Sequence, residues 1–223
     1  MGIAPDVDLP AGFTSIVTNF GIKDSTNDFT LVIADHQCAA AGVFTESRFA
    51  GPSVVLSRRH LENGTARAVT VLSKNANVAN GQVGRDDAIE VVQGVADHIG
   101  CDPHEVLIAS TGVIGRRYPM DVVRRGLRSL GTLRATPSAS AVAKCIMTTD
   151  TVPKAYSAQV VLSGQTVTIT GISKGAGMIR PNMATMLGFL ATDANIDPAL
   201  LPALAADLAN ASFNRITIDG DTS

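Results

Sequence analysis

The sequence contains no tryptophan, and aromatic residues make up only 4% of its 223 residues. This scarcity disfavours the stacking platforms that bind single-stranded nucleic acids. The 18 basic residues are outnumbered by 20 acidic ones, so the charge does not favour binding to a phosphate backbone. No run of about 18 apolar residues predicts a membrane-spanning helix. Apolar residues still make up 45% of the chain, which is typical of a globular protein with an aliphatic core.

Cysteine is also scarce, with Cys38, Cys101 and Cys145 far apart in the chain. An odd number at wide spacing disfavours a disulfide framework and favours a reducing compartment. The N-terminal sequence MGIAPDVDLPAGF has neither the basic start nor the apolar stretch of a signal peptide. We therefore expect a cytoplasmic protein.

A metal or nucleotide site is not indicated. The four histidines fall on different expected elements, and only Cys101 and His104 have the spacing of a ligand pair. A single C-x-x-H pair is weak evidence for zinc, and a surface loop explains it better. No G-x-S-x-G motif is present, and the glycines at 175 and 177 form an incomplete dinucleotide fingerprint. We expect no bound metal and no cofactor.

Short runs rich in Val, Leu, Ile and Thr, separated by turn formers, predict strands. These cover residues 29–35, 40–44, 52–57, 67–73, 105–110, 157–163 and 166–173, with residues 164–165 as a hairpin turn and a short last strand at 215–219. Apolar spacing and capping residues predict helices at 85–100, 119–131, 137–147 and 197–213. Strands and helices mixed in this way predict an α/β layered sandwich.

Two turns follow expected strands and carry polar groups. In ASTGVIG, residues 109–115, Thr111 and Gly112 combine a hydroxyl with an unshielded backbone N–H, a pair that can hold a developing oxyanion. Taken alone, this is an ordinary glycine turn. In KNANVANG, residues 74–81, the asparagines favour a structural turn over a binding loop. The acidic pair Asp86 and Asp87 is explained by a helix start, where carboxylates suit the dipole.

The segment SKGAGMIRPNMATML, residues 173–187, combines small flexible residues, a Pro-Asn turn and the Ala184–Thr185 peptide in front of an apolar run. Such a lead-in allows backbone strain and close approach to a ligand. KGAGMIRPNMATML resembles the processing signature of the ornithine acetyltransferase family, the bifunctional glutamate N-acetyltransferases. The similarity extends in consistent order over nearly the whole chain, through AAGVFTESRFAGP, KNANVANG, ASTGVIG, IMTTDTVPK and FNRITIDGDTS.

The resemblance implies that the chain cuts itself between Ala184 and Thr185. Thr185 then carries a free α-amine, which titrates near about pH 8, so one residue supplies both nucleophile and base. The family moves the acetyl group of N2-acetyl-L-ornithine to L-glutamate in arginine biosynthesis, through an acetyl-threonine and with ping-pong kinetics.

By the same resemblance, Thr111 and Gly112 fall on the oxyanion-hole positions of the family. Thr148 and Lys174, together with Thr185, fall on its substrate-binding positions. An ammonium at Lys174 suits an amino-acid carboxylate, and in the context of these motifs we favour this role over that of a surface lysine at a strand end.

The family fold is an α/β/β/α layered sandwich with the nucleophile at a sheet. Residues 1–223 would form the N-terminal part of this single fold, processed into an α chain of residues 1–184 and a β chain from residue 185 onward. We expect the two cleaved chains to form a heterodimer that assembles into a heterotetramer. No cofactor is implied, although some members accept acetyl-CoA as an alternative donor.

Two other hypotheses stay open. The first is an N-terminal-nucleophile amidase or aminopeptidase, which would cleave itself in the same way but use water as the acceptor. The second is an inactive truncated product, because the chain ends at Ser223 while the family contributes an acidic substrate-binding residue from farther along.

Overall fold

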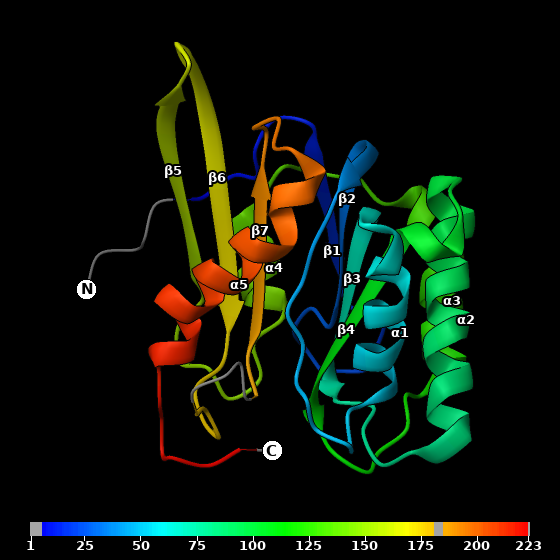
Figure 1. Ribbon diagram of the computed structural model, residues 1–223. Coiled ribbons are helices and arrows are strands. Elements are labelled where there is room, and N and C mark those ends of the chain that lie inside the picture. Colours follow the sequence, from blue (N-terminus) through cyan, green and yellow to red (C-terminus); the bar gives the residue numbers. More distant parts are fainter. Residues whose placement is uncertain (1–5, 181–184, 223) are drawn as a thin grey trace.

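The computed structural model describes residues 6–180 and 185–222. Its strands form two sheets that stack face to face, and helices flank them (Figure 1). The helices α1, α2 and α3 lie on the right of Figure 1 beside the first sheet, and α5 crosses in front of the second sheet. The expected α/β/β/α layered sandwich is thereby confirmed.

The first sheet has four strands in the order β1-β2-β3-β4. β1 (Phe13–Thr18), β2 (Phe29–Ala39) and β3 (Thr65–Asn75) are antiparallel neighbours, and β4 (Val106–Val113) runs parallel to β3. A parallel pair requires a long crossover connection, which contains α2 (Gly81–Ile99). The carboxyl ends of β3 and β4 therefore meet at the same edge of the sheet.

Helices α1 (Pro52–His60), α2 and α3 (Met120–Ser129) lie beside this sheet. α2 ends at Gly100, which takes the left-handed conformation and donates its N–H to the Ala96 carbonyl. The core between helices and sheet is mainly aliphatic, with Phe29 stacked on Phe20. Its fully buried side chains also include Leu31, Leu72, Val91, Val95, Val106, Val123 and Leu130.

The second sheet contains β5 (Lys154–Leu162), β6 (Gln165–Lys174) and β7 (Leu187–Thr192), all antiparallel, in that order. α4 (Ala139–Cys145) contacts strands of both sheets. A second apolar cluster fills the space between the sheets, formed by Leu9, Val71, Ala139, Val142, Ala143, Ile146 and Ile172. Because side chains alternate along β3, its Val71 joins this cluster while Leu72 joins the other.

The last helix, α5 (Leu201–Ala211), begins after Asp197, whose side chain accepts the N–H of Ala199. Short 3₁₀ turns complete the described structure at Leu61–Asn63, Pro103–Glu105, Leu130–Thr132, Pro198–Leu200 and Phe213–Arg215. Within residues 6–180 and 185–222, no helix has the length and apolar character needed to cross a membrane.

Three of the expected strands and the position of one expected turn are wrong. The strand expected at 52–57 is helix α1, and residues 40–44 are not in a strand because β2 ends at Ala39. The β5–β6 turn lies one residue earlier, at Ser163 and Gly164, both with positive φ. Residues 215–219 form only isolated bridges between Ile179 and the pair Ile218 and Asp219.

Candidate active site

A cavity of about 2500 Å³ is lined by both sheets and by α1 and α5. Five residues that the sequence singled out line it together: Thr111, Gly112, Thr148, Lys174 and Thr185. They come from the end of β4, the loop between α4 and β5, the end of β6 and the approach to β7. Ala184, the other residue of the expected cleavage site, lies outside the described residues.

The Thr111–Gly112 turn is shaped by the neighbouring strand. Lys74 of β3 pairs with Gly112, and both have positive φ, 98° at Lys74 and 126° at Gly112. A Cβ at Gly112 would overlap the Lys74 carbonyl group. Only glycine therefore fits here, and its backbone is exposed while Thr111 is buried.

Thr185 lies beside the end of β6. The first residue of β7, Leu187, pairs with Lys174, so Thr185 stands two residues before that pair. Its carbonyl oxygen lies 3.6 Å from the position that a Cβ on Gly175 would take. Thr185 is half-buried with a φ of 59°, a rare conformation for a β-branched residue.

Asp150 is a site residue that sequence reasoning missed. Its carboxylate is fully buried and lies within hydrogen-bond distance of Lys154 Nζ (2.8 Å) and of the backbone N–H groups of Gly175 (2.8 Å) and Thr148 (3.3 Å). Lys174 Nζ lies 3.7 Å from its other oxygen. Asp150 stands inside the quoted motif IMTTDTVPK, but nothing in the local sequence distinguishes its carboxylate from an exposed loop acid.

The charges of this group depend on each other. Burial lowers the pKa of Lys174, and the Lys154 charge lowers it further, whereas Asp150 acts in the opposite direction. Burial alone would raise the pKa of Asp150, but hydrogen bonds from Lys154, Gly175 and Thr148 and the charge of Lys174 lower it. The carboxylate is therefore kept ionised between two ammonium groups.

The segment before Thr148 is held by a third lysine, Lys23. Lys23 Nζ donates to the carbonyl oxygens of Asn27 (3.1 Å), Cys145 (2.9 Å) and Met147 (2.9 Å). The Ser73 hydroxyl also donates to the Cys145 carbonyl, at 2.7 Å. These bonds satisfy carbonyls at the end of α4 and fix the chain that carries Thr148 to the first sheet. The pKa of Lys23 is lowered, chiefly because the ammonium group is partly buried.

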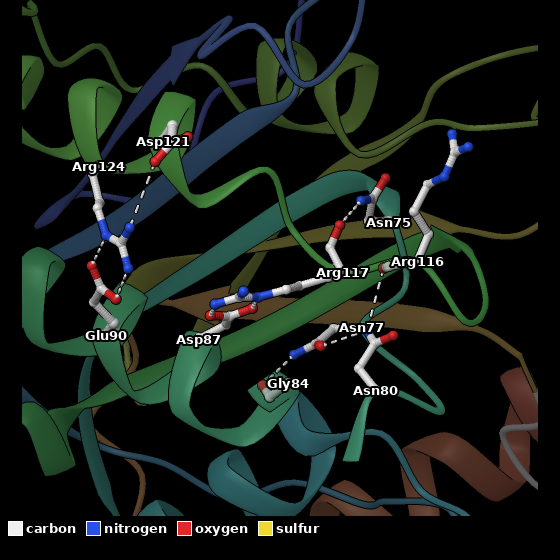
Figure 2. Close-up of polar contacts among 10 residues, drawn as sticks. All are labelled: Asn75, Asn77, Asn80, Gly84, Asp87, Glu90, Arg116, Arg117, Asp121 and Arg124. Carbon is white, nitrogen blue, oxygen red and sulfur yellow. Dashed lines mark hydrogen bonds and ion pairs between the residues drawn. The ribbon is translucent and has the colours of Figure 1, made fainter. Parts of the chain in front are cut away.

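The asparagine turn at residues 74–81 is structural, as the sequence favoured. Asn75 Nδ2 donates to the Arg117 carbonyl at 2.6 Å, and Asn80 Nδ2 donates to that of Arg116 at 3.2 Å (Figure 2). Asn77 Nδ2 donates to the Gly84 carbonyl at 2.8 Å. The amides thus bind the backbone of the loop that follows β4 and of α2, and they fix the asparagine turn to both.

Asp87 has a different role from the one expected. α2 begins at Gly81, so Asp86 and Asp87 lie beyond its first turn. Asp87 is buried and accepts two hydrogen bonds from Arg117, from Nε at 2.6 Å and Nη2 at 2.7 Å (Figure 2). The expected dipole effect is therefore wrong for both residues, and Asp87 instead joins α2 to the loop after β4.

The cysteine and histidine groups show no ligand set. Among residues 6–180 and 185–222, no cluster of three or more His, Cys, Asp or Glu could hold a metal ion, and all three cysteines are unpaired. His104 Nδ1 lies 3.0 Å from Asp102 Oδ1, within hydrogen-bond distance. Burial raises the pKa of the Cys145 thiol to about 12, which makes it an inert core residue.

Two stacked sheets flanked by helices define the class of this protein as an α/β/β/α sandwich, and comparison with known proteins gives its family. Residues 14–223 match the ArgJ family. The chain is 48% identical over 214 residues to the arginine biosynthesis bifunctional protein ArgJ 2 of a Nostoc species, and 45% identical over 215 residues to the glutamate N-acetyltransferase Oat2 of Streptomyces clavuligerus. Each alignment covers 96% of this chain and 54% of the relative, so the chain spans about half the length of these relatives.

Solved structures of two related proteins have the same fold as this chain. The arginine biosynthesis bifunctional protein ArgJ of Bacillus halodurans is 30% identical with a TM-score of 0.74, over 81% of this chain and 95% of that chain. Ornithine acetyltransferase of Mycobacterium tuberculosis, solved with ornithine, is 32% identical with a TM-score of 0.69, over 82% and 96%. The chain belongs to the ArgJ family, which confirms the resemblance that its motifs showed.

Proposed function

We propose that the complete protein of which this chain is a part moves the acetyl group of N2-acetyl-L-ornithine to L-glutamate, in arginine biosynthesis. The observation that carries this proposal is the shared cavity: Thr111, Gly112, Thr148, Lys174 and Thr185 come from separate elements and line one space. A hydroxyl nucleophile, oxyanion donors and an ammonium for a substrate carboxylate are the groups that acyl transfer between amino acids needs.

The first step is self-cleavage. The Thr185 hydroxyl attacks the Ala184 carbonyl carbon, the peptide C–N bond breaks, and water hydrolyses the resulting ester. Ala184 becomes the carboxyl end of one chain, residues 1–184, and Thr185 begins the other with a free α-amine. The positive φ of Thr185 supports this proposal, because backbone strain of this kind gathers at reactive sites.

The coverage of the solved chains agrees with cleavage at this place. About four fifths of this chain accounts for 95% and 96% of the Bacillus and Mycobacterium chains. Residues 1–184 are the same fraction of this chain.

In the transfer itself, the neutral α-amine of Thr185 takes the hydroxyl proton while the oxygen attacks the acetyl carbonyl. The oxyanion is held by the Thr111 hydroxyl and the Gly112 N–H. Collapse of the intermediate breaks the amide C–N bond, and the proton held by the Thr185 α-amine passes to the α-nitrogen of the departing ornithine. Glutamate then attacks the acetyl ester through its own α-amine and leaves as N-acetylglutamate. Thr148 and Lys174 bind the amino-acid part of each substrate.

The partners follow from the same proposal. The segment from residue 185 onward would be the second chain of a heterodimer, and two such heterodimers would form a heterotetramer. The reaction needs no cofactor, although acetyl-CoA stays open as an alternative donor. The cytoplasmic location also stays a prediction.

Expression of the complete protein and of Thr185→Ala and Thr185→Ser, followed by intact-mass measurement, tests the cleavage. We expect a break between residues 184 and 185 in the wild-type protein, a slower break in Thr185→Ser, and none in Thr185→Ala. A wild-type protein that stays whole contradicts the mechanism. Ornithine release from acetylornithine with and without glutamate then separates the alternatives, because only a transferase needs the acceptor for rapid release. A 223-residue chain that cleaves and turns over would exclude the inactive product.

A further inference from the structure

A buried carboxylate lies behind the substrate-binding residues of the cavity. Asp150 has a side chain that is 0% exposed, at the junction of the α4–β5 loop with β6. Its Oδ1 accepts from Lys154 Nζ and from the Gly175 N–H, and its Oδ2 accepts from the Thr148 N–H. Lys174 Nζ lies 3.7 Å from Oδ2. One carboxylate thus joins the α4–β5 loop and the start of β5 to the end of β6.

The two lysines bind this carboxylate in different ways. Lys154 forms the short contact, at 2.8 Å, and its side chain is 39% exposed. Lys174 is nearly buried and lies beyond hydrogen-bond distance of Oδ2. The negative charge of Asp150 therefore balances the positive charge of Lys174, while the N–H groups of Lys174 can still donate to a ligand in the cavity that it lines.

The other two contacts fix backbone at the site. The N–H of Thr148 belongs to one of the residues proposed to bind substrate. Gly175 follows Lys174 directly, has a φ of 154°, and lies against the carbonyl of Thr185. A Cβ at Gly175 would lie only 2.7 Å from Ile179 Cδ1, so the chain is tightly confined there. The bond from Gly175 to Asp150 therefore ties the surroundings of the nucleophile to the substrate-binding loop.

We propose that Asp150 is a positioning residue of the acetyl-transfer site, which holds the Lys174 ammonium and the Thr148 backbone where the substrate carboxylate binds. This inference rests on the proposed function, since it assigns Asp150 a part in the same reaction. Asp150 acts through Lys174 and Thr148 and does not touch the reacting atoms.

Removal of a negative or of a positive charge next to Lys174 should shift the pKa of Lys174 in opposite directions. Asp150 faces it with negative charge, and Lys154 and Lys23 face it with positive charge. Removal of the Asp150 charge lowers the pKa of Lys174 further, and removal of the Lys154 charge raises it. Because a substrate carboxylate needs the charged form of Lys174, KM rises as the pH increases through the pKa of that lysine.

The test uses Asp150→Asn and Lys154→Met in the complete protein, with kcat and KM for N2-acetylornithine measured from about pH 6 to pH 10. Asp150→Asn should move the rise in KM to lower pH, and on the alkaline side of that rise its KM should exceed the wild-type value about tenfold for each pKa unit of the shift. Lys154→Met should move that rise to higher pH. We expect kcat to change by less than about threefold, since neither residue touches the reacting atoms.

The control is Asp121→Asn, which removes a carboxylate that is 92% exposed on α3, and which should leave both constants and their pH profile unchanged. Equal shifts in both test variants, or an Asp150→Asn profile like that of the wild type, would overturn the inference. If Asp150→Asn does not fold, the direction of the Lys154→Met shift decides alone: upward supports the inference, and no shift contradicts it. A wild-type protein that transfers no acetyl group contradicts the proposed function instead, so the two failures are distinguishable.

Discussion

At the scale of single residues, the approach of Lys74 to Gly112 sets the shape of the turn that we propose as the oxyanion hole. The sequence predicted an exposed glycine there, and the structure adds the reason. The Lys74 carbonyl occupies the space in which a side chain would stand, and both residues have positive φ. A substitution at Gly112 must therefore move the backbone of β3 or β4.

Gly112→Ala should destabilise the chain by at least about 2 kcal/mol, because it adds both backbone strain and a clash with main-chain atoms. Gly115→Ala is the matched control, since Gly115 also has positive φ, 76°, but has open space around its Cβ position. It should cost only about 1 kcal/mol. Urea unfolding of the two variants measures the difference, and equal losses would show that strain alone explains the effect.

The buried carboxylate of Asp150 predicts how stability depends on pH. Its pKa is lower in the folded chain than in the unfolded one, so its stabilisation is fully present above its ordinary pKa. This stabilisation is lost as the pH falls through the lowered pKa. The difference in free energy of unfolding between wild type and Asp150→Asn should therefore be constant near neutral pH and shrink in acid. Denaturant titrations across about pH 2 to pH 7 test this, and a difference that persists in acid would contradict it.

Sequence reasoning reached the site residues through motifs and missed the residues that hold them. Thr111, Gly112 and Lys174 stand in recognisable segments, and the structure brings them to one cavity. Asp150 could not be singled out, because its side chain is buried by contacts with Lys154 and with the end of β6, and these contacts form only when the chain folds. Burial of a polar group follows from tertiary packing and has no local signal.

At the scale of elements, α1 shows why a short segment was misread. Its run PSVVLS has the composition of a strand, but its buried residues are polar and spaced as on a helix: Ser53, Ser57 and His60. Ser57 exchanges hydrogen bonds with both backbone groups of Ile108, at 2.7 Å, and His60 Nδ1 lies 2.9 Å from the Val106 carbonyl. The helix thus covers the edge of β4 with side chains. Apolar periodicity could not reveal a helix whose buried face is polar.

The connection between α2 and the loop after β4 gives an element-scale prediction. Asp87 is buried and bidentate with Arg117, whereas its neighbour Asp86 is exposed and accepts only from Gln82 in the part of the chain that the structure describes. Asp87→Asn should lower Tm by several degrees, on the order of 5 °C, because Arg117 loses its charged partner and a buried amide replaces it. Asp86→Asn should leave Tm unchanged. Thermal unfolding of the two variants compares them directly, and equal Tm values would show that the pair contributes nothing.

At the scale of the whole molecule, one side of the large cavity is apolar and open. The lining side chains of α5 include Leu204 and Leu208, which are 38% and 44% exposed, and Leu190 of β7 is 53% exposed nearby. Relatives are about twice as long as this chain. A buried apolar face gains about 25 cal/mol for each Å² removed from water, so a further part of the fold that packs here would be strongly favoured.

The complete protein should therefore cover this face, and the 223-residue chain should leave it open. We expect the isolated chain to enhance the fluorescence of the apolar dye ANS and the complete protein to do so much less. Leu208→Glu should reduce dye binding by the isolated chain and destabilise the complete protein, since it places a charge in a contact. Ile89→Glu is the control, because Ile89 is 53% exposed on α2, away from the cavity lining, and should change neither result. Equal dye binding by the two proteins would show that the face stays open, and the part of the complete protein that lies beyond residue 223 would then have to pack elsewhere.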